Sequence, residues 1–366
     1  MPDKMDNSRQ RFNDQIFFTL VNLKELFKTH PSSLRALLRV IRHQGKARRL
    51  RSKLLALGTP VPPLLIVSTT DSCNLQCAGC YARAVSRPGG AGLSGDRIRQ
   101  IVAEADQLGV SAMLLAGGEP LLQSDWLDAL AAHPKLGGLV FTNGTLLPGS
   151  WLEWFNRHRQ ILPVISLEGN DHTTDQRRGT GVSRMIQQSL ELLQDKCIPY
   201  GLSITVNRQN YSQVQSDEMM AGYIGRGCRL FVFIEYVPVE SGTEELALTL
   251  TEKQAFNKWT QEVQDRLPAM FLLFPGDEEP YGGCLASARG FVYISTNGDL
   301  EPCPFAPFSD RNLKQASLAE ALRSDLLQTV RSEHQLLQEG RGGCALWQNR
   351  EWVAALLNQN IASNES

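Results

Sequence analysis

The sequence predicts an α/β fold built as a partial (β/α)6 barrel of the TIM type. Short apolar segments alternate with longer segments of helical periodicity from residue 64 to residue 267. Strands that are separated only by helices lie parallel in one sheet. Because a closed barrel of this type has eight strands, we expect an open one. The strands are expected at 64–69, 111–116, 138–142, 161–167, 201–206 and 229–237, and the helices at 95–108, 123–133, 150–158, 182–195, 212–225 and 252–267.

Two further segments flank the predicted barrel. Residues 1–60 are expected to be a basic helical segment, because apolar residues recur at helical spacing and Pro31 interrupts them. This segment holds 13 Lys and Arg against four Asp and Glu, whereas the rest of the chain has a net charge of −10. Past residue 275 a hairpin is predicted around Asn297-Gly298, followed by a helix near 317–332. We therefore divide the chain into 1–60, a barrel at 61–274 and a small α+β domain at 275–366.

Composition excludes several classes of protein. With 42% hydrophobic and 20% charged residues over 366 positions, the chain can bury a sizeable core and is not disordered throughout. No apolar run approaches the roughly 20 residues of a membrane-spanning helix, and Met1–Gln10 is unlike a secretory signal. We therefore expect a cytoplasmic protein whose cysteines are metal ligands or catalytic groups, not disulfides. Of the eight cysteines, Cys197 and Cys228 are expected to be core residues.

Three cysteines in one short loop are the strongest chemical signal. Cys73, Cys77 and Cys80 follow the first predicted strand with the spacing Cys-x3-Cys-x2-Cys. Three thiolates so close together can hold three irons of a [4Fe–4S] cube and leave the fourth iron open to a bidentate ligand. A zinc site with a distant fourth ligand is the alternative that the three cysteines alone leave open.

Polar motifs end the other predicted strands. Gly117-Gly118-Glu119-Pro120 ends the second strand, where glycines let the backbone approach a ligand and a carboxylate can accept an ammonium group. Ser166 and Glu168 end the fourth strand and suit ribose hydroxyls. The active site of parallel βα folds lies at the C-terminal ends of the strands, so these motifs are expected to form one site. The remaining motifs are Thr142-Asn143-Gly144, Thr205-Val206-Asn207 and Glu235-Tyr236-Val237-Pro238.

In these motifs the sequence resembles the radical S-adenosylmethionine (SAM) superfamily over about residues 62–240. The resemblance implies a [4Fe–4S] cluster held by the three loop cysteines and by the amino and carboxylate groups of SAM. It also implies reductive cleavage of SAM to methionine and a 5′-deoxyadenosyl radical, which takes a hydrogen atom from the substrate. The implied SAM contacts are Gly117, Gly118 and Glu119 at the amino group, Ser166 and Glu168 at the ribose, and Tyr81 and Val237 at the adenine.

Other residues are assigned to this site by their position. Arg178 is a candidate for the SAM carboxylate, although a surface arginine is the alternative. Asn143, Thr205 and Asn207 are expected to line the cofactor site. The candidates for a general base are Glu235, Tyr236, Asp277 and Tyr281.

A second set of cysteines lies near the C-terminus. Cys284 and Cys303 flank the predicted hairpin, with Gly298 five residues before Cys303, and this pattern resembles the start of the SPASM and Twitch extensions. Those extensions of radical SAM enzymes hold auxiliary iron–sulfur clusters. Only Cys344 follows, so we expect at most one auxiliary cluster, with an open iron or a non-cysteine ligand. Three buried cysteines without metal are the alternative.

The resulting hypothesis is an oxygen-sensitive radical SAM enzyme that acts on a small metabolite or cofactor precursor. A dehydrogenation of this substrate is one reaction that it would catalyse. The auxiliary cluster would accept an electron from the substrate radical or bind the substrate itself. Alternatives are a maturase of a ribosomally made peptide or protein side chain, an activase that installs a glycyl radical, and a non-enzymatic iron–sulfur or zinc scaffold. The expected partners are a small-molecule or peptide substrate and a flavodoxin- or ferredoxin-type electron donor.

The basic N-terminal helices are expected to form a cap whose leucines pack on the barrel and whose arginines face water. Contact with anionic lipid or nucleic acid, and docking of an acidic electron donor, are the alternatives. We expect no sequence-specific binding of nucleic acid.

Overall fold

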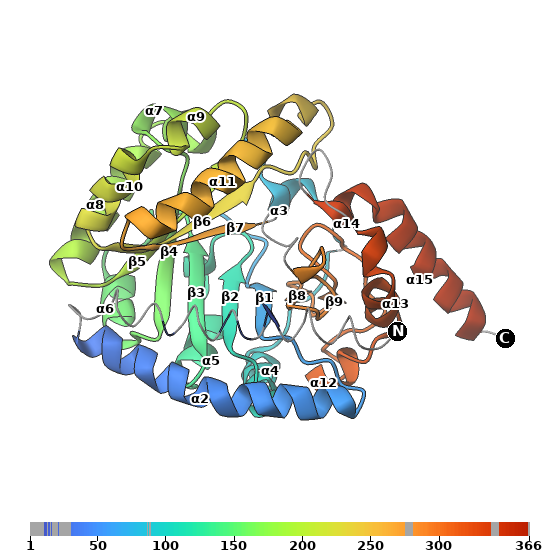
Figure 1. Ribbon diagram of the computed structural model, residues 1–366. Coiled ribbons are helices and arrows are strands. Elements are labelled where there is room, and N and C mark those ends of the chain that lie inside the picture. Colours follow the sequence, from blue (N-terminus) through green and yellow to red (C-terminus); the bar gives the residue numbers. More distant parts are fainter. Residues whose placement is uncertain are drawn as a thin grey trace.

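A single sheet of nine strands forms the centre of the protein (Figure 1). The computed structural model describes residues 11, 12, 14, 16, 21, 31–85, 87, 89–274, 281–337 and 344–364, with side chains described up to residue 357. The sheet order is β7-β6-β5-β4-β3-β2-β1-β8-β9. The strands are β1 (Leu64–Ser68), β2 (Ala112–Ala116), β3 (Gly137–Thr142), β4 (Ile161–Leu167), β5 (Tyr200–Val206), β6 (Cys228–Glu235), β7 (Met270–Phe274), β8 (Phe291–Ile294) and β9 (Leu300–Glu301).

The expected open parallel barrel is confirmed. All neighbouring strands pair in parallel except β8 and β9, which form the predicted antiparallel hairpin. The helices are α2 (Pro31–Ala56), α3 (Tyr81–Ala84), α4 (Gly95–Leu108), α5 (Asp125–Ala131), α6 (Ser150–Arg157), α7 (Asp171–Arg178), α8 (Val182–Asp195), α9 (Tyr211–Val214), α10 (Asp217–Gly225), α11 (Leu250–Arg266), α12 (Leu318–Ala321), α13 (Asp325–Ser332), α14 (Ala345–Gln348) and α15 (Arg350–Asn364). The expected helices at 212–225 and 317–332 are each divided into two.

Three strands, β7, β8 and β9, extend the sheet beyond the six that were expected for the barrel. β7 continues it beside β6, and β8 joins it beside β1. The rings of Phe274 in β7 and Phe291 in β8 lie 5.3 Å apart, so the two strands approach each other across the open side of the barrel. The proposed division between residues 274 and 275 therefore stays a prediction, and β8 and β9 belong to the same sheet as the barrel strands.

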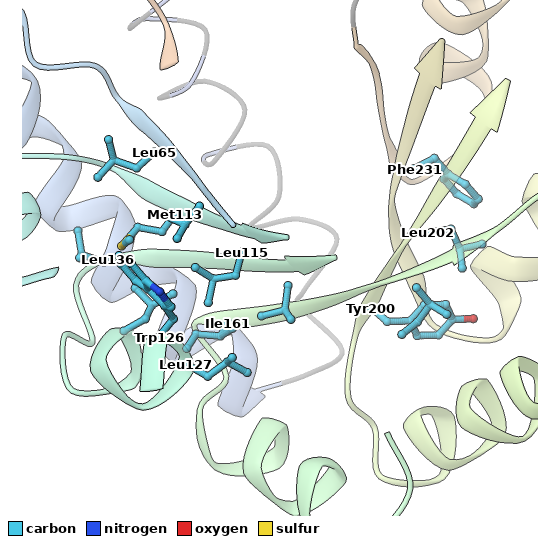
Figure 2. Packing of buried hydrophobic residues seen from close by; sticks show 14 of the residues in the cluster. Leu65, Met113, Leu115, Trp126, Leu127, Leu136, Ile161, Tyr200, Leu202 and Phe231 are labelled. Carbon is cyan, nitrogen blue, oxygen red and sulfur yellow. The ribbon is translucent and has the colours of Figure 1, made fainter. Parts of the chain in front are cut away.

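The two faces of the strands differ in burial. In β2, Met113 and Leu115 are fully buried on the outer face, in one cluster with Trp126 and Leu127 of α5 (Figure 2). Leu114, between them on the inner face, is only half-buried. Side chains alternate between the faces of a strand. The helices thus cover the outer face, and the inner face borders a cavity.

The basic helix α2 runs along the bottom of the view in Figure 1. Its buried stripe includes Gln44 and Arg51, which hydrogen bond to Ser111 at the start of β2. The cations of α2 that face water are Arg35, Arg39, Arg42, Lys46, Arg49 and Lys53. The expected cap is confirmed only in part. Most of its arginines face water, but no leucine belongs to the buried stripe, which consists of Ser33, Val40, Gln44, Ala47 and Arg51. Most of the helix expected before Pro31 lies outside the described residues. No helix within the described part of the chain is long and apolar enough to cross a membrane.

Candidate functional site

The sheet surrounds a cavity of about 850 Å³, and the predicted motifs meet in it. The three loop cysteines line this cavity. It is also lined by eight of the predicted cofactor-binding residues, namely Tyr81, Gly117, Gly118, Glu119, Asn143, Ser166, Arg178 and Thr205. Glu168, Asn207, Val237, Glu235 and Tyr236 do not belong to the lining. Most of the residues that were predicted from their position at strand ends thus lie around one cavity.

The cysteine loop is held against the end of β2 by backbone contacts. The Gly118 amide donates to the Thr70 carbonyl at 2.7 Å, and the Glu119 amide donates to the Ser72 carbonyl at 2.9 Å. A Cβ on Gly118 would collide with the Ser72 carbonyl, and Gly117 has a φ of +114°. The glycine pair therefore lets the strand end approach the loop itself, whereas the sequence suggested an approach to the ligand.

The three loop thiols are accessible and free of disulfides. Cys73 is exposed, and Cys77 and Cys80 are half-buried. Partial loss of hydration raises the pKa of Cys73, and the negative charges of Glu119, Cys77 and Cys80 raise it further. A bound cation would offset this accumulation of negative charge and favour the thiolates.

The donor set fits a cube better than a single zinc ion. Among the described residues, no group of three or more His, Cys, Asp and Glu side chains is arranged to hold one metal ion. A structural zinc requires four ligands that converge on one point. In a cube each thiolate binds a different iron, so the three sulfur atoms need not converge.

Glu119 lies at the centre of the strand ends and is almost completely buried. Its Oε1 accepts hydrogen bonds from the Thr142 hydroxyl at 2.6 Å and the Leu121 amide at 3.0 Å, while its Oε2 accepts one from the Asn143 amide at 2.8 Å. Burial raises the pKa of Glu119, and these hydrogen bonds oppose the shift. An ionised carboxylate offers about four acceptor sites. One acceptor direction on Oε2 thus remains for a cationic donor from a ligand.

Glu168 is buried between two arginines of α7. Its Oε1 accepts from Arg177 Nη1 at 2.6 Å and from Arg178 Nη2 at 2.6 Å, whereas Oε2 is buried without a hydrogen-bond partner among the described residues. A buried carboxylate oxygen without a donor is costly. A ligand hydroxyl that donates to Oε2 would remove this cost.

Arg177 ties the cysteine loop to the neighbouring strand ends, although the sequence singled out only Arg178. Arg177 Nε donates to the Ala78 carbonyl at 3.1 Å, and Nη1 donates to Thr205 Oγ1 at 2.8 Å. The Ala78 amide in turn donates to the Arg177 carbonyl at 2.9 Å. One arginine thus fixes the loop between its second and third cysteines.

Asn143 connects the end of β3 to the cysteine loop. Its Nδ2 donates to Asn74 Oδ1 at 2.8 Å and lies 4.0 Å from Cys73 Sγ. The Asn143 Oδ1 accepts from the Thr145 hydroxyl at 2.7 Å. The amide thus orients the loop and approaches the first sulfur, which suits a second layer of contacts around a cluster.

The second set of cysteines is buried behind one wall of the cavity. Cys284, Cys303 and Cys344 belong to one buried cluster. Burial raises the pKa of Cys303 well above its ordinary value, and the hydrogen bond with Cys344 raises it further. None of the three thiols lines the cavity, but Leu285, Pro304 and Phe305 do. The second set is therefore separated from the cavity by the residues that follow Cys284 and Cys303.

Tyr81 lies between the two sets of cysteines. Its ring is 5.4 Å from that of Phe305, and both rings line the cavity. Loss of hydration raises the pKa of Tyr81, with further contributions from Tyr293, Cys80 and Cys303. Tyr81 directly follows Cys80 and packs against the buried cluster that contains Cys284, Cys303 and Cys344, so it links the two sets.

Two of the four candidates for a general base, Glu235 and Tyr236, do not line the cavity. Glu235 is buried, and its Oε2 lies 3.1 Å from Lys253 Nζ of α11, which favours a structural ion pair. The Tyr236 ring covers the cysteine loop, because a Cβ on Gly79 would lie 2.9 Å from the Tyr236 hydroxyl. Asp277, a further candidate, lies outside the described residues, whereas Tyr281 lines the cavity.

Three other expectations are answered by the structure. Asn207 Oδ1 accepts from the Gln209 and Asn210 amides and so stabilises its own turn. Val237 is buried in an apolar cluster with Ile66. Cys228 is buried as expected, but the expectation for Cys197 was wrong, because this residue is exposed at a helix end with a φ of +50°.

Sequence reasoning missed several polar residues of the lining, among them Thr142 and Ser203. Thr142 bonds Glu119, and Ser203 on β5 lies beside Ser166 on β4 in the sheet register. Thr142 was part of a recognised motif but was assigned no contact. Ser203 lies inside a strand, and only its polarity within an apolar run could have identified it.

Comparison with known proteins agrees with this site. A family model described as the Radical SAM superfamily matches residues 67–218. The AdoMet-dependent heme synthase of Methanosarcina barkeri is 23% identical over 81% of this chain and 91% of its own length. The pre-heme d1 synthase of Dinoroseobacter shibae is 32% identical over 44% of this chain and 40% of its own length. Streptococcus suis SuiB, solved with the precursor peptide SuiA, superposes with a TM-score of 0.62 at 19% identity, covering 84% of this chain and 74% of SuiB.

Proposed function

Residues 67–218 of this chain belong to the radical SAM superfamily, and from this membership we propose that the protein modifies a cofactor precursor or other small metabolite by hydrogen abstraction. The family binds a [4Fe–4S] cluster and SAM. When bound, they supply the reductive cleavage of SAM and the radical that removes a hydrogen atom from the substrate. The observation that supports this proposal best is the meeting of Cys73, Cys77 and Cys80 with Glu119 in one cavity.

We assign the three loop cysteines as the ligands of the cluster. Gly117 and Gly118 hold the loop against β2, and Arg177 holds it against the ends of β4 and β5. These contacts position the thiols before any cofactor binds. Preorganised ligands reduce the cost of ordering the site.

The remaining polar residues at the strand ends would orient SAM. Glu119 Oε2 would accept a hydrogen bond from the amino group, and Glu168 Oε2, buried without a donor, would accept one from a ribose hydroxyl. Ser166 and Thr205 line the cavity, and Arg177 Nη1 bonds both Thr205 Oγ1 and Glu168 Oε1. Arg178 stays a candidate for the SAM carboxylate, with two of its nitrogen atoms already bonded to Glu168.

We further propose that residues 275–366 are a SPASM/Twitch-like extension, with an auxiliary iron–sulfur cluster at Cys284, Cys303 and Cys344. Burial of these thiols behind Pro304 and Phe305 supports an electron-accepting role over direct binding of the substrate. In a two-electron oxidation the substrate would lose a hydrogen atom to the 5′-deoxyadenosyl radical, which would become 5′-deoxyadenosine. The substrate radical would then lose a proton and pass its remaining electron to the auxiliary cluster. A flavodoxin- or ferredoxin-type protein is the proposed source of the reducing electron.

The names of the relatives support a cofactor precursor as the substrate class. The heme synthase and the pre-heme d1 synthase are both named for making haem-type products. The likeness to SuiB, at 19% identity, concerns the fold and does not identify a peptide substrate here. Modification of a peptide therefore remains the second hypothesis.

Iron content and SAM cleavage test this proposal together. After anaerobic reconstitution we expect about eight irons per chain, and about four when either set of three cysteines is replaced by alanine. Formation of 5′-deoxyadenosine with a chemical reductant should be abolished only by Cys73→Ala/Cys77→Ala/Cys80→Ala. The exposed Cys197→Ala is the matched control and should change neither quantity.

Each contrary result has a definite meaning. If the fully loaded wild-type protein did not cleave SAM, the proposal would fail and a scaffold would be favoured. If the wild type held about four irons and only the Cys73→Ala/Cys77→Ala/Cys80→Ala variant lost them, the assignment of an auxiliary cluster would be withdrawn.

A further inference from the structure

The cavity extends from the cysteine loop into a part of the barrel that the proposed chemistry does not use. Besides the strand ends, its lining includes Leu64, Leu114, Leu139, Phe141, Val232, Ile234, Met270 and Leu272 from the inner faces of the strands. Leu114 of β2 pairs with Leu139 of β3, and Val232 of β6 pairs with Leu272 of β7. The register thus places apolar side chains beside each other on β2 and β3, and again on β6 and β7.

These side chains are incompletely packed although they lie inside the barrel. Leu114, Leu139, Phe141, Ile234 and Leu272 are only half-buried, whereas Met113 and Leu115 on the outer face are fully buried. Apolar surface left open in an interior loses both the hydrophobic gain and the packing contacts. An apolar ligand would supply both.

The charges of the lining are confined to its ends. Among the described residues that line the cavity, the carboxylates and guanidinium groups belong to Glu119, Arg177 and Arg178 beside the cysteine loop, and to Asp265 on α11. Asp265 precedes β7 and so lies toward the N-terminal ends of the strands. A charged group placed between these ends would lose its hydration without gaining an opposite charge.

One polar strip interrupts the apolar wall. Ser166 of β4 and Ser203 of β5 are paired in the register, and Val232 of β6 follows beside Ser203. Both hydroxyls face the cavity. A neutral oxygen or nitrogen on an otherwise apolar ligand could bond there and fix its orientation.

We propose that the substrate places an uncharged alkyl or aryl group in the barrel, between the Leu114–Leu139 side and the Val232–Leu272 side, with Ser203 as the polar contact. Any charged part of the substrate stays near Arg177 and Arg178 or outside the barrel. This inference rests on the proposed function where it calls the bound molecule the substrate. The binding of an apolar group in the barrel does not depend on that function. It identifies Leu139 and Leu272 as residues that determine specificity.

A matched pair of probes tests the claim that the bound group is uncharged. N-phenyl-1-naphthylamine and 8-anilino-1-naphthalenesulfonate share one skeleton and differ by a sulfonate. With the reconstituted protein in equilibrium dialysis, we expect the neutral probe to bind at least tenfold more tightly. Equal or weaker binding of the neutral probe would overturn the inference.

Variants locate the probe within the barrel. Leu139→Glu should weaken binding of the neutral probe at least tenfold, and Leu139→Met should change it less than twofold. Leu57→Glu and Leu250→Glu place the same charge at leucines that are 66% and 55% exposed, and should leave binding unchanged. If Leu139→Glu does not fold, Leu139→Trp fills the same space without a charge and should weaken binding by a similar factor. Undiminished binding by every folded Leu139 variant would overturn the proposed location.

The cofactor chemistry is measured on the same samples. If the wild type did not cleave SAM but bound the neutral probe as expected, the result would count against the proposed function alone. Normal iron content and SAM cleavage without binding of the neutral probe would count against this inference alone. The two proposals therefore fail separately.

Discussion

The carboxylate of Glu168 illustrates how much of this site depends on single buried residues. It is 2% exposed and bonds Arg177 and Arg178, whose side chains are also largely buried. Removing one member of a buried ion pair leaves a charge without compensation and costs several kcal/mol. The same carboxylate keeps one buried oxygen without a hydrogen-bond partner among the described residues, and this is the oxygen proposed to accept a ribose hydroxyl. Stability and binding thus converge on one residue.

Replacement of this residue should be costly to stability. We expect Glu168→Gln to lower the free energy of unfolding by about 3 kcal/mol, since two buried guanidinium groups lose their counter-charge. Urea unfolding followed by tryptophan fluorescence measures this change. Glu153→Gln breaks the exposed pair with Lys196 and should leave the free energy of unfolding almost unchanged, because water screens this pair. Equal effects of the two variants would contradict the buried-pair argument.

At the scale of elements, the end of β2 shows why the Gly-Gly motif has two glycines. Gly117 needs its positive φ, and Gly118 needs the absence of a Cβ beside the Ser72 carbonyl. Since this carbonyl belongs to the backbone, it cannot move aside as a flexible side chain would. The strand and the cysteine loop therefore form one rigid unit.

A single methyl group at this contact should displace the loop. We expect Gly118→Ala to reduce the iron content after reconstitution by at least half, because the displaced loop no longer holds its three cysteines where the cluster binds. Gly45→Ala is the matched control, since Gly45 lies within α2 and its Cβ would meet nothing within 4 Å. It should keep full iron content and stabilise the fold by about 0.5–1 kcal/mol. Full iron content in Gly118→Ala would refute the steric argument.

The elements also show what the sequence could and could not predict. The strands β1 to β6 were expected within two residues at each end, because apolar runs bounded by turns mark buried parallel strands. β7 was missed, since Met270–Phe274 is a short apolar run that directly follows a helix and has no periodicity of its own. The burial of Glu235 toward Lys253 could not be predicted either, because it depends on how α11 packs.

On the scale of the whole molecule, a buried ion pair connects the C-terminal hairpin to the segment that follows the cysteine loop. Arg87 donates twice to Glu301 of β9, at 2.8 Å and 3.1 Å to Oε2, and its guanidinium lies 4.8 Å from the Tyr293 ring centre. The Thr296 hydroxyl adds a bond to Asp71 at 2.8 Å. The second set of cysteines and the first loop are thus fixed to each other.

This pair should make the stability of the whole fold depend on pH. Burial raises the pKa of Glu301 from 4.5 to about 7, although Arg87 opposes the shift. The folded chain therefore binds more protons than the unfolded chain between these values, so the free energy of unfolding falls as the pH rises through this window. The decrease should be on the order of 3 kcal/mol. Glu301→Gln cannot ionise, and its unfolding should lack this decrease.

Urea unfolding of both proteins at pH 5 and pH 8 tests the expectation, because the other carboxylates, Asp299 among them, are common to both and largely cancel in the difference. The free energy of unfolding of the wild type minus that of Glu301→Gln should be larger at pH 5 than at pH 8. An unchanged difference would mean that Glu301 is ionised throughout the range. Arg87 would then neutralise it as a permanent ion pair, and the contact between hairpin and loop would be independent of pH.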